Sequence, residues 1–157
     1  MRRPHLAAAL FALSAVEGLG MARKPPEKKM DDPARLAAVD VQPSEWKGHS
    51  CGVAVPGARI VTTAAAWSAL WKESFGAEAP PVDFARFVAV AAFAGSRNTG
   101  GWSAELLAPE AGPKGIVVPY RVKGPAPGAF VTMAFTAPYA VRLYNRPAGP
   151  LATEERR

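Results

Sequence analysis

The chain has 157 residues, of which 49% are hydrophobic and 20% are charged, and its formal net charge at pH 7 is +6. This length allows one domain with a substantial core and excludes two domains of ordinary size. The lone cysteine, Cys51, excludes an internal disulfide, and we expect it to pack as a small buried hydrophobe.

The first segment, residues 1–22, has the order of a cleavable signal peptide. Arg2 and Arg3 precede an uncharged apolar run at residues 6–16, and small residues for a cleavage site are available as Gly18 and Gly20 or as Gly20 and Ala22. The run is shorter than the roughly 20 apolar residues of a membrane span. We therefore expect export to the periplasm or the extracellular space, and a mature chain without a transmembrane segment. The alternative is an uncleaved or cytoplasmic amphipathic N-terminus.

Charge and proline content divide the remaining chain into three parts. Residues 23–45 mix basic side chains with prolines and predict a flexible lead-in, and residues 148–157 predict a polar tail. The compact domain is expected at residues 46–147. Much of the positive charge lies in the two ends, and no stripe of interleaved basic and aromatic residues indicates nucleic acid binding.

One amphipathic helix is predicted at residues 64–75. Thr62 or Thr63 can cap its start, and Gly76 ends it. Its apolar side chains recur at intervals of three and four residues, which places them on one face. We expect this face to pack in the core, and a cofactor-binding role is the alternative for the same residues: Trp67, Leu70, Trp71 and Phe75.

The other predicted elements are short β-strands. They fall at residues 52–55, 59–63, 82–95, 102–108, 116–122, 130–136 and 140–144. The first two runs are two short strands or one bent strand, and the third and fourth are expected to be joined by a turn. Asp83 and Phe84 begin the third run, where the Asp83 carboxylate can accept backbone N–H bonds. We predict an α+β fold: a mostly antiparallel sheet of about six short strands with one amphipathic helix packed on one face.

The sequence GSRNTGGW at residues 95–102 is the main candidate for recognition. Its glycines permit positive φ, so the first interpretation is a hairpin turn. The same residues also bring together a cation, hydrogen-bonding groups and an aromatic ring, which suits contact with a protein surface. The candidate protein-binding residues are Arg97, Asn98, Thr99, Gly100, Gly101 and Trp102.

Catalytic and metal-binding signals are weak. Cys51 and His49 are the one nucleophile and base that lie close in sequence, and no acid is marked to orient them. His5 would be lost with the leader, so the spacing supplies no convincing metal-ligand set. We expect no cofactor, no metal and no catalytic residue.

Four features in this order resemble the PrcB family, named for a subunit of a secreted bacterial protease complex. They are a tryptophan-bearing helix at 66–71, Val-Asp-Phe at 82–84, the glycine-containing turn at 95–102, and Thr-Ala-Pro-Tyr at 136–139. The similarity spans roughly residues 51–146, and Trp102 stands where the family pattern has tyrosine. The resemblance implies an accessory domain of exported proteins, associated in its namesake with a protease partner.

We therefore expect an exported, noncatalytic protein-interaction module, an accessory or stabilising subunit whose partner is another exported protein such as a protease. Two alternatives remain. One is a hydrolase that uses Cys51 and His49, and the other is an envelope structural protein whose basic arm binds anionic surfaces.

Overall fold

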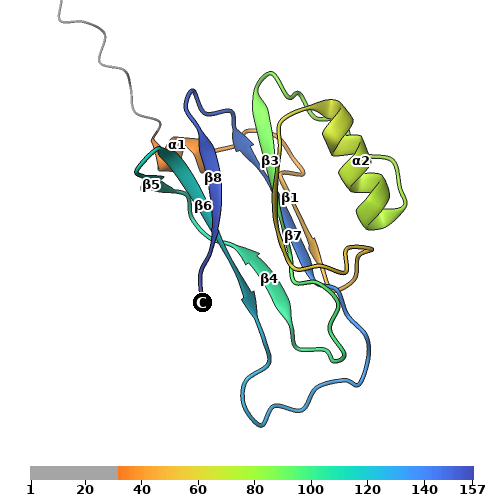
Figure 1. Cartoon of the computed structure of the whole chain (residues 1–157). Coiled ribbons are helices and arrows are strands. Elements are labelled where there is room, and N and C mark those ends of the chain that lie inside the picture. Colours follow the sequence, from red (N-terminus) through yellow and green to blue (C-terminus); the bar gives the residue numbers. More distant parts are fainter. Residues whose placement is uncertain (1–31) are drawn as a thin grey trace, which may run out of the picture.

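The computed structural model describes residues 32–157 (Figure 1). The predicted signal peptide, the basic cluster at residues 23–29 and the alternative of an anionic-surface arm all lie outside the described residues. In chain order the elements are α1 (Pro33–Ala37), β1 (Glu45–Gly48), β2 (Gly57–Val61), α2 (Ala64–Phe75), β3 (Phe87–Phe93), β4 (Ser103–Leu106), β5 (Glu110–Gly112), β6 (Gly115–Lys123), β7 (Tyr139–Asn145) and β8 (Leu151–Glu155).

The strands form two sheets. The first has the order β1-β7-β3-β2 and is antiparallel throughout. In the second, β6 pairs antiparallel with β4 and β5 and in parallel with β8. The predicted α+β, mainly antiparallel class is confirmed. The prediction of one sheet with about six strands and one helix is corrected to two sheets with eight strands and two helices within residues 32–157.

Strand β3 explains why two sheets are needed. All seven of its residues are buried, and they alternate between two cores. Ala89 and Ala91 face the helix α2, whereas Val88 and Val90 face the second sheet. Because both faces of this strand are apolar, one covering layer is not enough. The result is three layers, with α2 outside the first sheet and the second sheet against its other face (Figure 1).

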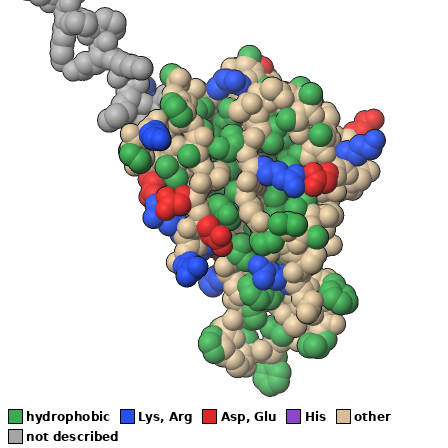
Figure 2. All heavy atoms as spheres, in the orientation of Figure 1, with side chains coloured by type: hydrophobic (Ala, Val, Ile, Leu, Met, Phe, Trp, Pro, Cys, Tyr) green, Lys and Arg blue, Asp and Glu red, His purple; other side chains and the backbone are tan. Residues whose placement is uncertain are grey.

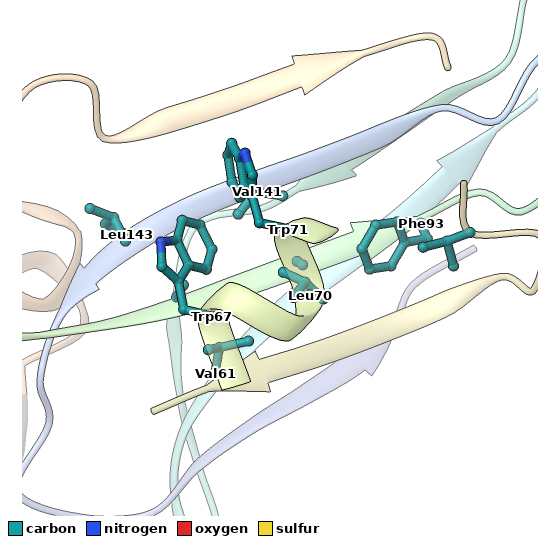
Figure 3. Close-up of a cluster of buried hydrophobic side chains, with 10 residues drawn as sticks. Val61, Trp67, Leu70, Trp71, Phe93, Val141 and Leu143 are labelled. Atoms are coloured by element: carbon teal, nitrogen blue, oxygen red, sulfur yellow. The ribbon is translucent and has the colours of Figure 1, made fainter. Parts of the chain in front are cut away.

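Helix α2 has the predicted bounds. The Thr63 side chain accepts a hydrogen bond from the Ala66 N–H, and Gly76 ends the helix with a left-handed φ of 62°. Trp67, Leu70 and Trp71 project from the helix onto the sheet (Figure 3). The indole Nε1 of Trp67 donates to the Pro80 carbonyl at 2.8 Å, so its polar atom is satisfied.

The aromatic residues of α2 stack in a continuous row. Ring centroids lie 4.7 Å apart for Trp67 and Trp71, 4.8 Å for Trp71 and Phe75, and 4.7 Å for Phe75 and Tyr139 of β7. Trp46 of β1 meets Trp71 edge-on at 5.3 Å. These predicted core residues therefore clamp the helix onto the first sheet, and the cofactor alternative receives no support from their placement.

The structure differs from the predictions for residues 52–55 and for residues 95–102. Residues 52–55 do not form a strand, because they pass beneath the end of α2, where the Gly52 N–H donates to the Ser74 carbonyl at 2.7 Å. A Cβ at Gly52 would lie 2.5 Å from the Glu73 carbonyl oxygen. Residues 95–102 do not form a hairpin, because β3 and β4 belong to different sheets.

The C-terminal half requires two further corrections. Residues 130–136 lie in a long loop between β6 and β7 and not in a strand. The predicted polar tail instead contains β8, whose Leu151 packs beside the buried Ile116. The sequence did not predict this strand because most of its side chains are polar and exposed. It is held by its backbone pairing with β6 and by the ion pair of the following residue, Arg156, with Glu110.

Residues 32–45, the described part of the predicted flexible lead-in, pack against the domain. Leu36 of α1 is buried beside Tyr144, and the Asn145 side chain donates to the carbonyls of Arg35 and Ala38 at 2.8 Å each. One buried leucine among charged residues was too weak a signal to predict this docking.

The alanines of β3 set the spacing between layers, so enlarging one should destabilise the fold. We expect Ala91→Leu to lower the free energy of unfolding by about 1–3 kcal/mol or more, because the added atoms meet the Trp67 and Trp71 layer. Ala69→Leu on the exposed face of α2 is the control and should change stability by less than about 0.5 kcal/mol. Urea denaturation measures both, and equal values would contradict this account of the layers.

Candidate functional site

Residues 95–102, here called the glycine turn, carry the chain from the first sheet to the second. Gly95 adopts a φ of 72° directly after β3. A Cβ at this position would lie 2.8 Å from the Ala54 carbonyl oxygen, so the close approach requires glycine. The turn is thus a crossover between sheets.

Arg97 and Trp102 brace the glycine turn from within. The guanidinium carbon of Arg97 lies 4.1 Å from the centroid of the Trp102 ring, within the range of a cation–π contact. The Arg97 Nε donates to the Ala94 carbonyl at 3.0 Å. Both residues, which we predicted to contact a partner, therefore have structural contacts of their own.

A second crossover runs beside the glycine turn. Residues 124–138, here called the apolar loop, lead from β6 of the second sheet back to β7 of the first. The backbones of Arg97 and Thr136 form a β-bridge, with N···O distances of 2.7 and 2.9 Å. The Gly100 N–H donates to the Thr132 carbonyl at 2.9 Å, and the Thr136 hydroxyl donates to the Thr99 carbonyl at 2.9 Å.

The glycines let the two crossovers touch. A Cβ at Gly101, whose φ is 81°, would lie 2.9 Å from Cβ of Pro125 and 3.0 Å from Cγ1 of Val131. On the other side, a Cβ at Gly124 would lie 3.2 Å from the Trp102 ring. The requirement for glycine at 101 therefore comes from a neighbouring segment as well as from the local turn.

The far end of the apolar loop is a tight turn. The Ala129 N–H donates to the Ala126 carbonyl at 3.0 Å, with Pro127 second and Gly128, at a φ of 78°, third in the four-residue turn. Proline and glycine in these positions are typical of a type II turn. The segment that follows is thus held at both ends, by this turn and by the bridge to Arg97.

Three large apolar side chains of this loop are exposed. Phe130 is fully exposed, and Met133 and Phe135 are each 86% exposed. Figure 1 shows the loop projecting below the two sheets, and Figure 2 shows hydrophobic side chains on that projection. Val131, between them, turns inward against Gly101. A group of large exposed apolar residues is a candidate interaction site.

The sequence prediction missed these three residues because it assigned 130–136 to a strand. The sequence contained a signal for a loop here. The run GPAPG at residues 124–128 predicts a turn, and the mainly apolar residues after it carry no charge before Arg142. The apolar loop contains no titratable side chain. Its side chains are apolar apart from the hydroxyls of Thr132 and Thr136.

Cys51 and His49, the candidate nucleophile and base, differ in their surroundings. Cys51 packs against the core beneath α2, and burial raises the pKa of its thiol above the ordinary value. His49 is exposed, and the hydrogen bond it makes is through its carbonyl, which accepts from the Ala137 N–H. No hydrogen bond joins the two side chains within the described residues.

The other predicted structural residues lie away from the apolar loop. Asp83 Oδ1 accepts a hydrogen bond from the Ala85 N–H at 2.9 Å, and Phe84 packs 6.1 Å from the Trp67 ring. Within residues 32–157, no group of three or more His, Cys, Asp or Glu side chains is placed to hold a metal ion. No helix in the same range has the length and apolarity to cross a membrane.

Substitution of two glycines distinguishes the cost of backbone strain from the cost of crowding between the two crossovers. Both Gly101 and Gly128 have positive φ, but nothing lies within 4 Å of a Cβ at Gly128. We expect Gly128→Ala to cost about 1–2 kcal/mol of stability from strain alone. Gly101→Ala should cost about 2–4 kcal/mol, since contact with Pro125 and Val131 adds to the strain. Equal losses in urea denaturation would show that the crossovers are not tightly packed in solution.

The Cys51 environment predicts slow alkylation. Because the thiolate is the reactive species and burial raises the pKa, the rate with iodoacetamide should begin to rise at a higher pH than for free cysteine. The chain unfolded in denaturant is the control and should react like free cysteine. A rise at a lower pH than free cysteine would instead indicate an activated nucleophile and revive the hydrolase alternative.

The comparisons with known proteins bear on the same segment. The family model described as PrcB C-terminal matches residues 88–142, from β3 through to β7. Searches of curated proteins and of solved structures gave no significant match. The matched range is narrower than the 51–146 expected from the motifs, and it omits α2. It confirms the resemblance: over residues 88–142, which include the glycine turn and the apolar loop, this chain matches the PrcB family.

Proposed function

We propose that this chain is an exported, noncatalytic protein-interaction module that docks onto a partner protein through the apolar loop. The observation that carries the proposal is the exposure of Phe130, Met133 and Phe135 on a loop that is itself firmly braced. The family match supports it, because PrcB is named for a subunit of a protease complex and the match includes this loop.

Comparison of the free energy of burial with the cost of association favours a loop that is already fixed in its bound form. Burying the three side chains would contribute about 1.5–3 kcal/mol each, or about 5–9 kcal/mol together. Association costs about 4–15 kcal/mol before any ordering of the loop. The gain and the cost are therefore of similar size, and a loop already fixed in its bound form avoids a further cost. The Pro127–Gly128 turn and the bridge to Thr136 provide that preorganisation.

The proposal changes the roles of the predicted contact residues. Arg97, Thr99 and Gly100 bind the apolar loop through their backbones, so they position the contact surface. Asn98 is exposed beside them and can extend the contact. The three apolar side chains, which sequence reasoning placed in a strand, become the main contact.

Export and partner class complete the proposal. Residues 1–22 support export, and an exported accessory subunit would meet its partner, such as a protease, in the periplasm or outside the cell. The hydrolase alternative is less favoured, because Cys51 packs against the core and burial raises the pKa of its thiol.

Polar substitution of the loop tests this function. We expect the triple variant Phe130→Ser, Met133→Ser, Phe135→Ser to lose a specific partner captured by cross-linking in the native envelope fraction. Each substitution alone should weaken capture about 10-fold or more. Stability should stay within about 0.5 kcal/mol of the parent, since these side chains are exposed.

Val55→Ser is the matched control. Val55 is also a large apolar residue, 72% exposed, but it precedes β2 and lies outside the apolar loop. This variant should capture the partner as well as the parent chain does. Equal capture by the triple variant and the control would overturn the proposed function.

A further inference from the structure

We infer that the partner surface that receives the apolar loop is an apolar groove bordered by carboxylates, with Arg97 and Lys123 as the cations that meet them. This inference rests on the proposed function and adds the chemistry of the partner. It follows from the charges around the loop and from which of them are already paired.

The sequence around the loop contains no acidic residue. Between Glu110 and Glu154 there is no Asp or Glu, and the apolar loop itself has no charge of either sign. Five cations fall in this stretch of sequence, Lys114, Arg121, Lys123, Arg142 and Arg146, and of these Lys123 ends β6 where the loop begins, whereas Lys114 lies at the opposite end of β6. On the face shown in Figure 2, basic side chains gather at the base of the projection, and neither acidic nor basic ones lie on it. On this face the base of the projection is therefore basic.

Most arginines elsewhere in the domain are already paired. Carboxylate partners occur for five of them, in the pairs Arg59–Glu73, Arg86–Asp40, Arg121–Glu105, Arg142–Glu45 and Arg156–Glu110. Arg146 donates to the carbonyls of Thr62 and Phe84. These side chains are engaged within the domain.

Arg97 and Lys123 differ from that group. Within residues 32–157 neither has a carboxylate partner, and the two terminal nitrogens of Arg97 donate to no described residue. Lys123 is exposed at the end of β6, next to Gly124, against which the Trp102 ring packs. Since Arg97 stacks on the same ring, both cations lie at the base of the apolar loop.

The stacked guanidinium is prepared for a carboxylate. The contact with Trp102 and the bond from Nε to Ala94 fix its plane and leave two N–H-bearing nitrogens available. A planar guanidinium with two free nitrogens suits bidentate binding of a carboxylate. Charge complementarity beside an apolar contact also speeds association and selects the partner.

A protein groove fits these observations better than a lipid surface. A fluid bilayer accepts apolar side chains at any spacing and would gain nothing from the fixed Pro127–Gly128 turn. Surfaces that recognise anionic lipid usually present clusters of about 4–8 Lys or Arg. Here two unpaired cations flank a rigid loop, which suits a shaped receptor with a few carboxylates.

Photo-cross-linking in the native envelope tests the inference. The full chain carries p-benzoylphenylalanine in place of Phe130, and the yield of the protein adduct is compared between variants. We expect Arg97→Gln plus Lys123→Gln to reduce the yield about 10-fold or more, and raising the salt to about 0.5 M to reduce the parent yield. The adduct peptide of the partner should contain apolar residues near Asp or Glu.

A control variant removes the same charge elsewhere. Lys72→Gln plus Lys114→Gln alters two exposed lysines, on α2 and on the β5–β6 turn, and should change the yield less than about twofold. Because Arg97→Gln also removes the bond to Ala94, Lys123→Gln alone is made as well. It leaves the brace intact and should still lower the yield several-fold.

The outcomes separate this inference from the proposed function. A protein adduct whose yield is equal in all variants would overturn the carboxylate groove while leaving docking through the loop in place. No protein adduct from any variant would overturn the proposed function itself. Binding to phosphatidylglycerol vesicles that depends on Phe130 and Lys123, without a protein adduct, would assign the loop to a lipid surface and overturn both.

Discussion

The burial of β3 on both faces is the constraint on which the rest of the structure depends. Its alanines let the indoles of Trp67 and Trp71 approach from one side, and its valines meet the second sheet on the other. Here a second sheet covers the other face of this central strand, and the chain crosses between the sheets three times, from β3 to β4, from β6 to β7 and from β7 to β8. The three-layer arrangement follows from the apolar sequence of this one strand.

The first two crossovers, the glycine turn and the apolar loop, fall at the same end of the molecule. Phe93, the last residue of β3, pairs with Tyr139, the first of β7, and Ser103, the first of β4, pairs with Lys123, the last of β6. The glycine turn and the apolar loop therefore start and finish beside one another. Since neither can complete a strand ladder within its own sheet, their backbone groups pair with each other.

Local features of the sequence could be predicted, whereas features that depend on distant contacts could not. The α2 helix was found at its observed bounds, because Thr63, Gly76 and the aromatic spacing act within one segment. The strand β8 was missed, because it is held by its backbone against β6 and its side chains are polar. The apolar run at 130–136 was mistaken for a strand, since its partner is the glycine turn and not a sheet.

In the apolar loop the backbone provides the support, and the large apolar side chains are left exposed. The apolar loop is fixed by main-chain bonds at Thr132 and Thr136 and by packing at Pro125 and Val131. The side chains of residues 130, 133 and 135 take no part in that support and remain exposed. Stability therefore does not require apolar residues at these three positions. Their apolar character is the basis on which we propose a contact outside this chain.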